Sequence, residues 1–357
     1  MFTIAVSGIN ATDNPGPGLP VAKSLKESDL PVKTIGLSYD VNDPGHYVKD
    51  YLDYSFILPF PTKGWEGIKK RLLEIKKLVG LDLIIPCLDA ELPLFIQYAK
   101  ELAEEGIKTF LPDKELFALR EKENLEQVAG KIGITYPKTI AVFDLEQLDA
   151  AISRFGFPVM VKGPYYKAAK VTDYPAAHYN FNCISAEWGF PILVQQVVSG
   201  EEFNVIGLGS GDGDDMGMVA IKKTTITNLG KIWSGVTIYH EGMLAAARKF
   251  VEDFKWKGPF ELECIVDKDQ IYLIEINPRF PAWAYFATGV GINLAERLAK
   301  QVLLAPEERP QNYKNSKYDA GKLFMRYTDE KVLDIDVFQN LVTKGQSHIF
   351  KPSSSDE

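Results

Sequence analysis

The stretch that decides the fold is residues 258–280, Gly-Pro-Phe-Glu-Leu-Glu-Cys-Ile-Val-Asp-Lys-Asp-Gln-Ile-Tyr-Leu-Ile-Glu-Ile-Asn-Pro-Arg-Phe. Two runs rich in β-forming residues, Leu262–Val266 and Ile271–Ile276, flank the polar residues 267–270. Polar turn residues between two such runs predict a β-hairpin.

The register of this hairpin decides which side chains share a face. If Lys268–Gln270 forms a three-residue loop, Glu263 lies opposite Glu275 and Glu261 lies opposite Asn277. A slip of one residue would place Glu263 and Glu275 on different faces. Because like charges directly opposite one another destabilise a sheet, the expected pair favours a bound cation.

Carboxylate and amide oxygens at this hairpin suit Mg²⁺, which proteins usually hold with one or two carboxylates and substrate phosphates. Arg279 follows directly, and its planar guanidinium suits a phosphate or a carboxylate. The alternative is a solvated hairpin face with scattered acids, and for Glu263 and Glu275 alone it is the better explanation. The complete run Glu-x-Asn-Pro-Arg after an apolar strand favours a metal and phosphate site.

Composition narrows the class of protein. The chain has 357 residues, a net charge of −8 and the apolar and charged fractions of a globular protein with two or three units. The acidic balance argues against nucleic acid as a partner, and no apolar run is long enough to cross a membrane. The N-terminus lacks the features of a signal peptide. Three widely spaced cysteines, Cys87, Cys183 and Cys264, form neither a disulfide framework nor a zinc site, so we expect a cytoplasmic protein.

Residues 1–110 alternate between strand and helix patterns, which predicts a doubly wound, mainly parallel sheet. The expected strands are 2–7, 32–38, 56–58, 81–85 and 109–111, and the expected helices are 20–28, 65–79 and one that ends at 105. Ligands bind at the carboxyl ends of such strands, where the loops Asn10–Gly18 and Asp89–Glu91 lie. A tight structural turn explains the glycines of the first loop equally well, and their spacing is not that of a dinucleotide-binding loop.

Further helix and strand patterns follow after residue 111. The expected helices are 113–132, 145–155, 243–254 and 294–304, and the expected strands outside the hairpin are 138–143, 158–163, 192–198, 202–208, 218–227, 231–237 and 322–327. Residues 351–357 are rich in serine, and we expect a flexible tail there.

Two lysines and one apolar strand could serve a phosphate compound. Lys162 ends an apolar strand and can place a point charge on a phosphate, although a strand-end lysine more often reaches solvent. Lys122 by itself is an exposed helix residue. The segment 192–202 can offer backbone groups to an adenine edge, with Glu202 accepting a ribose hydroxyl, or can be an ordinary edge strand.

In their order along the chain, these segments resemble the ATP-grasp superfamily over about residues 111–304. The resemblance implies an α+β ATP-grasp domain at 111–350, with a lid subdomain at about 137–198 and a metal-binding, catalytic subdomain at about 199–350 that together clasp ATP. It also implies that residues 1–110 form a Rossmann-like domain, similar to that of biotin carboxylase and carbamoyl phosphate synthetase.

The resemblance also carries nucleotide-binding roles to single residues. The two family lysines that contact ATP phosphates match Lys122 and Lys162, the latter at the end of Pro-Val-Met-Val-Lys. The hinge whose backbone reads adenine matches residues 195–198, and the ribose-binding acid matches Glu202. We therefore expect nucleotide contacts at Lys122, Lys162, Gln195, Gln196, Val198 and Glu202.

The family's metal ligands match Glu263, Glu275 and Asn277. Its arginine near the transferred phosphate or the acid substrate matches Arg279, so Arg279 and Lys162 are the expected catalytic residues. One departure is the lid, where a Gly-rich loop is usual and this chain has Gly-Pro-Tyr-Tyr-Lys-Ala-Ala-Lys at 163–170. The hinge is the other, because it begins with two glutamines where an acid is common.

The resemblance implies an ADP-forming ligase that phosphorylates a carboxylate and joins the acyl phosphate to an amine or a thiol. Its cofactors would be ATP and Mg²⁺, with Mn²⁺ as an alternative, and its partners small-molecule carboxylate and amine substrates, an amino acid or a peptide among them. No nucleic acid or membrane partner is expected, and a homodimer is compatible. A nucleotide-binding regulatory or scaffold protein that retains the fold is the alternative, and a nicotinamide site in the first loop is a weaker one.

Overall fold

The computed structural model describes residues 1–12, 14–164, 167–227, 230–310, 313 and 317–347. The chain divides into two compact units. Unit 1 comprises Met1–Ala118, Phe203–Leu262 and Ile276–Glu357, and unit 2 comprises Leu119–Glu202 and Glu263–Glu275. The expected domain boundaries at 110, 198 and 350 stay predictions, and the expected tail lies outside the described residues.

The N-terminal part of unit 1 is the predicted parallel sheet. Its strands lie in the order β3-β2-β1-β4, and they are β1 (Phe2–Ser7), β2 (Val32–Ser38), β3 (Tyr54–Ile57) and β4 (Leu83–Ile85). All three neighbouring pairs are parallel. The chain leaves β1 in one direction to build β2 and β3 and later returns to the other side with β4. The carboxyl ends of β1 and β4 therefore flank a topological switch point, where doubly wound sheets bind ligands.

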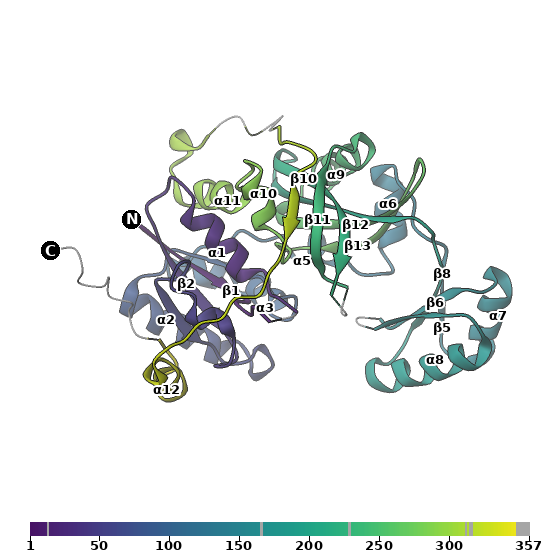
Figure 1. The fold of residues 1–357 in the computed structure, drawn as a ribbon, viewed down its shortest axis with the longest axis horizontal. Coiled ribbons are helices and arrows are strands. Elements are labelled where there is room, and N and C mark those ends of the chain that lie inside the picture. Colours follow the sequence, from purple (N-terminus) through teal and green to yellow (C-terminus); the bar gives the residue numbers. More distant parts are fainter. Residues whose placement is uncertain (13, 165–166, 228–229, 311–312, 314–316, 348–357) are drawn as a thin grey trace. The chain divides into compact units, whose positions relative to one another are not determined.

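Helices cover both faces of this sheet, as a doubly wound fold requires (Figure 1). Ile4 and Val6 of β1 pack with α1 (Gly18–Lys26), whereas Ala5 packs on the other side with α2 (Trp65–Val79). The predicted third helix is two short ones, α3 (Leu92–Gln97) and α4 (Ala99–Glu104), which meet at Tyr98. The predicted strand at 109–111 is wrong, because only Lys108 pairs there, as an isolated bridge to Leu83.

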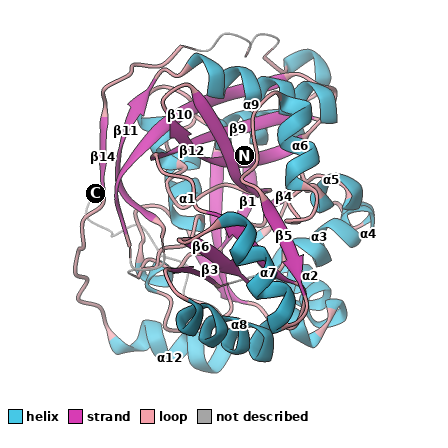
Figure 2. Ribbon diagram, turned by 90° about the vertical axis from the view of Figure 1, so that its right-hand side faces the viewer, coloured by secondary structure: helices cyan, strands magenta, loops and turns pink. Residues whose placement is uncertain are grey.

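A six-stranded sheet in the order β13-β12-β9-β10-β11-β14 forms the second part of the fold. Figure 2 labels β9, β10, β11, β12 and β14 of this sheet. Its strands are β9 (Glu201–Ser210), β10 (Asp215–Ile226), β11 (Ile232–Ile238), β12 (Lys257–Asp267), β13 (Gln270–Asn277) and β14 (Leu323–Met325). The pairs β9–β10, β10–β11 and β11–β14 are antiparallel. The helices α9 (Glu241–Phe254), α10 (Tyr285–Gly289) and α11 (Leu294–Leu303) belong to the same part of the chain. The last helix, α12 (Ile335–Lys344), ends at the C-cap residue Gly345, whose carbonyl accepts the Ile57 N–H of β3 at 2.9 Å.

Unit 2 contains a four-stranded antiparallel sheet in the order β5-β8-β6-β7. Its strands are β5 (Thr139–Val142), β6 (Val159–Lys162), β7 (Ala168–Val171) and β8 (Ile192–Gln196). The helices α7 (Leu145–Phe155) and α8 (Tyr174–Trp188) pack on one face, and each begins at an aspartate that accepts a backbone N–H. Neither β7 nor α8 was expected from the sequence.

The predicted long helix at 113–132 is wrong. The chain forms α5 (Lys114–Ala118) and α6 (Leu125–Ile132), with Lys122 in the turns between them. The Lys122 ammonium donates a hydrogen bond to the carbonyl of Gly163, so a tertiary contact overrides the local helix propensity of this charged segment.

The predicted hairpin within residues 258–280 is present, but its turn is shorter than expected. β12 ends at Asp267 and β13 begins at Gln270, so the turn is Lys268-Asp269, and the three-residue loop on which the expected register depended is wrong. The pairing of Glu263 with Glu275 therefore stays a prediction. Lys268 has φ 55°, the left-handed conformation that two-residue hairpin turns use. Within the described residues, no helix combines the length and the apolar character that crossing a membrane requires.

Candidate functional site

Strand alternation sorts the side chains of the small sheet in unit 2 onto two faces. The buried Val159 and Val161 of β6 point toward α7 and α8, so Lys162 lies on the opposite face. Gln195 of β8 shares that face, and Lys162 Nζ donates to Gln195 Oε1 at 2.6 Å. Gln195 Nε2 in turn donates to Thr139 Oγ1 at 2.8 Å, which fixes the amide.

Lys122, Lys162 and Glu275 form a charged cluster in unit 2. The pKa of Lys162 is lowered to about 8, first by burial and then by the charge of Lys122, while Glu275 opposes the shift. Burial also lowers the pKa of Lys122, and Glu275 again opposes it. Two desolvated ammonium groups that share one exposed carboxylate form a region suited to additional negative charge.

The expected adenine hinge follows this cluster along β8. Gln195 is buried, Gln196 is exposed, and the Gln196 backbone N–H donates to the Lys138 carbonyl at 2.9 Å. Strand pairing ends there, and Val198 lies in the half-buried loop that leads into β9. Glu202, near the start of β9, is exposed. Their nucleotide contacts stay predictions.

The expected lid is a β-hairpin formed by β6 and β7. The Gly163 N–H donates to the Lys167 carbonyl at 3.0 Å across its end. Lys167 pairs with Glu187 of α8, while Lys170 is exposed on β7. Tyr165 and Tyr166, the residues that replace the usual glycines, lie outside the described residues.

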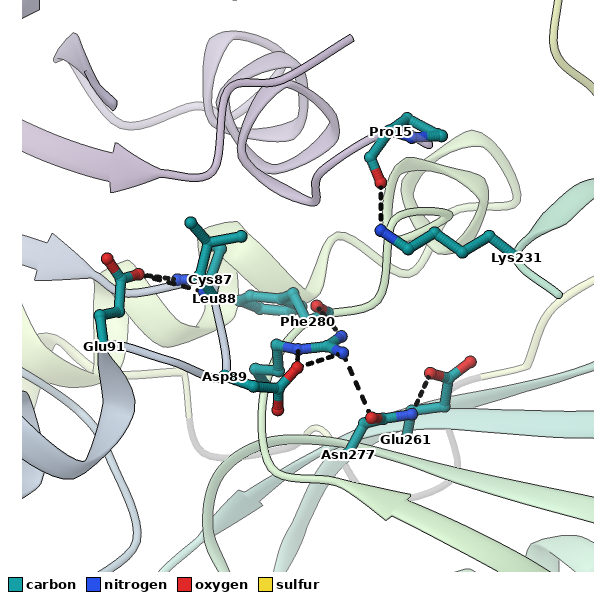
Figure 3. Close-up of polar contacts among 10 residues, drawn as sticks. Pro15, Cys87, Leu88, Asp89, Glu91, Lys231, Glu261, Asn277 and Phe280 are labelled. Carbon is teal, nitrogen blue, oxygen red and sulfur yellow. Dashed lines mark hydrogen bonds and ion pairs between the residues drawn. The ribbon is translucent and has the colours of Figure 1, made fainter. Parts of the chain in front are cut away.

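Unit 1 contains a second polar cluster, which is built on Arg279. Its Nε and Nη2 atoms donate to Asp89 Oδ2 at 2.8 and 2.7 Å, and Nη2 also donates to Asn277 Oδ1 at 3.2 Å. Asp89 lies in the loop after β4, as Figure 3 shows. The predicted Arg279 therefore lies at the switch point of the parallel sheet.

Glu261 holds the amide of this cluster, and its role was not foreseen beyond its place opposite Asn277. The buried Glu261 accepts hydrogen bonds from Asn277 Nδ2 at 3.0 Å, Asn204 Nδ2 at 2.6 Å and Trp283 Nε1 at 2.7 Å. The contact with Asn277 is drawn in Figure 3. Three donors on one carboxylate make Glu261 a positioning residue for Asn277.

Glu91 was also missed as a single residue, although its loop was expected to bind a ligand. This fully buried acid accepts the backbone N–H groups of Cys87 at 2.9 Å and Leu88 at 3.1 Å. The hydroxyls of Ser7 and Tyr39 contact the same carboxyl group. Burial raises the pKa of Glu91. These bonds fix the loop that presents Asp89.

The expected metal ligands belong to one strand pair. Glu263 is half-buried on β12 and Glu275 is exposed on β13, while Asn277 is buried two residues further along β13. Two carboxylates and an amide are a hard oxygen donor set, which fits Mg²⁺ in kind. Among the described residues, no group of three or more His, Cys, Asp and Glu side chains could hold a metal ion. The metal contacts of Glu263, Glu275 and Asn277 stay predictions.

Part of the chain is similar to a known protein family. Residues 167–282 match the family model of an ATP-grasp domain. Over these residues the chain is similar to an ATP-grasp domain. The resemblance noted from the sequence is confirmed, as is the fold class, with a parallel sheet followed by the antiparallel sheets of this domain.

Solved structures support the same fold. An N5-carboxyaminoimidazole ribonucleotide synthetase from Thermus thermophilus is 16% identical, with a TM-score of 0.63 over 85% of this chain and 79% of that chain. The biotin carboxylase domain dimer of Hydrogenobacter thermophilus 2-oxoglutarate carboxylase, in complex with MgADP, ADP and bicarbonate, is 17% identical, with a TM-score of 0.63 over 87% and 70%. An L-amino acid ligase from Bacillus licheniformis is 15% identical, with a TM-score of 0.62 over 85% and 74%.

Proposed function

We propose that this protein is an ADP-forming ligase that activates a carboxylate as an acyl phosphate and joins it to an amine. The observation that carries the proposal is the pair of desolvated lysines, Lys122 and Lys162, beside Glu275. The match of residues 167–282 to an ATP-grasp domain supports it. Similar folds in an N5-carboxyaminoimidazole ribonucleotide synthetase and in an L-amino acid ligase support the reaction class.

The nucleotide would be held by unit 2. Lys122 and Lys162 would bind phosphate oxygens, and an incoming anion would restore the proton that burial makes Lys162 lose easily. Gln195 holds Lys162 in place, while Gln196 and Val198 would face the adenine and Glu202 the ribose. Glu263, Glu275 and Asn277 would hold Mg²⁺, or Mn²⁺, which supplies positive charge to the phosphates during transfer.

The carboxylate substrate would bind at Arg279. Its oxygen attacks the γ-phosphorus of ATP, the bond to the β-phosphate oxygen breaks, and ADP leaves with the electron pair. The amine then attacks the acyl carbon of the acyl phosphate, inorganic phosphate leaves, and the amine loses one proton to form the amide. Positioning and charge stabilisation suffice for the first step, so no side-chain nucleophile is needed.

The three free cysteines and small-molecule substrates fit a cytoplasmic enzyme, and a homodimer is compatible with the proposal. The competing proposal is a nucleotide-binding regulatory protein without ligase activity. Its support is the lid, which lacks the usual glycines and in which Lys167 is engaged by Glu187.

A screen for ADP release separates the two. Purified protein with ATP and Mg²⁺ is incubated with a matrix of carboxylic acids and amines, amino acids included. The ligase proposal expects ADP that depends on an acid, and a condensation product when an amine is present. Tight ADP binding with no acid-dependent turnover across the matrix would support the regulatory protein instead.

A further inference from the structure

Three neighbouring strands of unit 2 each contribute one polar side chain to the same face of the small sheet. Thr139 of β5 lies directly opposite Gln195 of β8 in the antiparallel register. Lys162 of β6 pairs with Leu193, two residues before Gln195, so the lysine lies diagonally across from that amide. Because side chains alternate between the faces of a strand, Thr139, Gln195 and Lys162 share one face.

The donors and acceptors of these side chains allow only one direction of hydrogen bonding. An ammonium can only donate, so the amide oxygen of Gln195 must face Lys162, whose Nζ donates to Oε1 at 2.6 Å. This orientation turns the amide nitrogen toward Thr139, and Nε2 donates to Oγ1 at 2.8 Å. The Thr139 hydroxyl donates in turn to the Pro137 carbonyl at 2.8 Å. A chain of three hydrogen bonds therefore connects Lys162 to the backbone before β5.

Burial makes the middle of this chain of bonds hard to rearrange. Gln195 is only 2% exposed, and a buried amide that loses a partner costs about 1–3 kcal/mol. Tyr136 also takes part, because Thr139 and Gln195 both hydrogen-bond its hydroxyl, and burial raises the pKa of this tyrosine. The amide thus has partners at both of its ends, which fix its orientation toward Lys162.

We propose that Thr139 is a positioning residue for nucleotide binding, which acts through Gln195 to hold Lys162 in place for a phosphate. The inference rests on the proposed function, in which Lys162 binds phosphate, and adds a residue that no motif singles out. An ammonium has three N–H donors, so the bond to Gln195 leaves Lys162 able to bind phosphate oxygens as well.

The advantage of such positioning is entropic. A lysine side chain carries about 2 kcal/mol of rotamer entropy, and a lysine that is already held loses less of it when a phosphate binds. A purely structural Thr139 would instead only join β5 to β8, without a particular effect on Lys162.

Binding of ADP with Mg²⁺ tests this role without any turnover, and isothermal titration calorimetry measures each Kd. Thr139→Val keeps the size of the side chain but loses the hydroxyl, and we expect the Kd for ADP to rise about threefold to tenfold, the value of one hydrogen bond. Thr139→Ser keeps the hydroxyl and should bind ADP as the wild type does. Thr172→Val, at an exposed threonine of the same unit, is the matched control.

A double-mutant cycle with Lys162 separates positioning from a structural role. If Thr139 acts through the lysine, adding Thr139→Val to Lys162→Met should change the Kd of that variant by less than about twofold. An equal loss of affinity in both backgrounds would overturn the proposal, because Thr139 would then support the unit rather than the lysine. An unchanged Kd in Thr139→Val alone would overturn it as well.

A second variant covers the case in which Thr139→Val folds poorly. Gln195→Met breaks the chain of bonds one step nearer to the lysine, and we expect the Kd for ADP to rise about tenfold. No rise in this variant would refute the proposal, since Thr139 can reach Lys162 only through this amide.

The same assay keeps this inference distinguishable from the ligase proposal. A wild type that binds ADP but shows no acid-dependent turnover would contradict ligation alone, and the cycle with Thr139 would still decide the positioning role. A wild type that binds no ADP would contradict both.

Discussion

At the scale of single residues, Lys162 shows how burial lowers the pKa of a lysine. It shares the sheet face with Gln195 because strand alternation puts the valines of β6 in the core. Its lowered pKa of about 8 lies close to physiological pH, so its charge depends on its surroundings.

This shift predicts a pH dependence of activity. Above about pH 8 the free enzyme loses the Lys162 proton, so kcat/KM for ATP should fall on the alkaline side. In Lys162→Arg the guanidinium stays charged, and that alkaline limb should move to higher pH. An identical limb in the variant would show that another group controls it.

The lowered pKa of Lys162 also predicts that stability rises with pH, whereas activity falls. Between about pH 8 and the ordinary lysine pKa of 10.5, the unfolded chain holds a proton that the folded chain has released. The contribution of Lys162 to the free energy of unfolding therefore rises with pH across that window. Chemical denaturation of the wild type and Lys162→Met at several pH values measures it, and a difference that stays constant would contradict the assignment.

Glu275 carries the test of the metal site. Glu275→Gln removes a charge while keeping the size of the side chain, and we expect turnover to fall about a hundredfold to a thousandfold, as when one charge-stabilising group is lost. Glu104→Gln, on the exposed surface of α4, is the control. Near-normal ADP release from Glu275→Gln would rule out this residue as a ligand.

The sequence predicted the roles of some of these residues and missed those of others. Lys122 and Lys162 are ordinary lysines one at a time, and only their order with the hairpin pointed to a phosphate site. Glu261 and Thr139 were missed because their roles depend on partners far away in the chain.

At the scale of elements, the Gly-rich loop after β1 is tightly packed. The N–H groups of Gly16 and Gly18 donate to the carbonyls of Asn10 and Gly8 at 2.8 and 2.9 Å. A Cβ atom on Gly16 would lie 2.2 Å from the Gly8 oxygen, so no larger residue fits. The glycines therefore satisfy a structural requirement of this loop.

Gly16→Ala should destabilise unit 1 by about 1–3 kcal/mol, as overpacking does. Gly67→Ala is the matched control, because its added Cβ would meet nothing closer than 3.6 Å in the exposed part of α2. The control should be neutral or stabilising by about 0.5–1 kcal/mol, the usual preference of a helix for alanine. Urea denaturation compares the two, and equal stabilities would refute the packing argument.

The sequence predicted the ends of helices and strands correctly only where no tertiary contact changed the local structure. The hairpin was predicted from its β-rich runs, but its turn length depends on the left-handed Lys268. α8 was missed because exposed aromatic residues, Tyr174 and Tyr179, obscure the apolar spacing of Ala177, Phe181 and Ile184.

At the scale of the whole molecule, ligand binding should couple to global stability. Mg²⁺ with ADP at about a hundred times its dissociation constant should add about 2.7 kcal/mol to the free energy of unfolding, and chelating the metal should remove most of that gain. Differential scanning fluorimetry with ADP, with and without EDTA, measures it. A melting temperature that ADP raises equally in EDTA would argue against a metal at Glu275 and Asn277.

The fold class was predictable because the alternation of strands and helices extends over long segments. The partition into units was not, because unit 2 takes residues from two separate parts of the chain. The tip of the β12–β13 hairpin belongs to it, and there Thr135 exchanges backbone hydrogen bonds with Ile271 and Leu273, at 2.9 and 2.8 Å.

This arrangement has a practical consequence for anyone who wants unit 2 as an isolated fragment. A fragment that spans only Leu119–Glu202 omits Glu263–Glu275, the segment that supplies both the hydrogen bonds to Thr135 and the carboxylate beside Lys122. A workable excision would join the two pieces by a short engineered linker, or supply the hairpin tip as a separate peptide, so that the lysines keep their carboxylate.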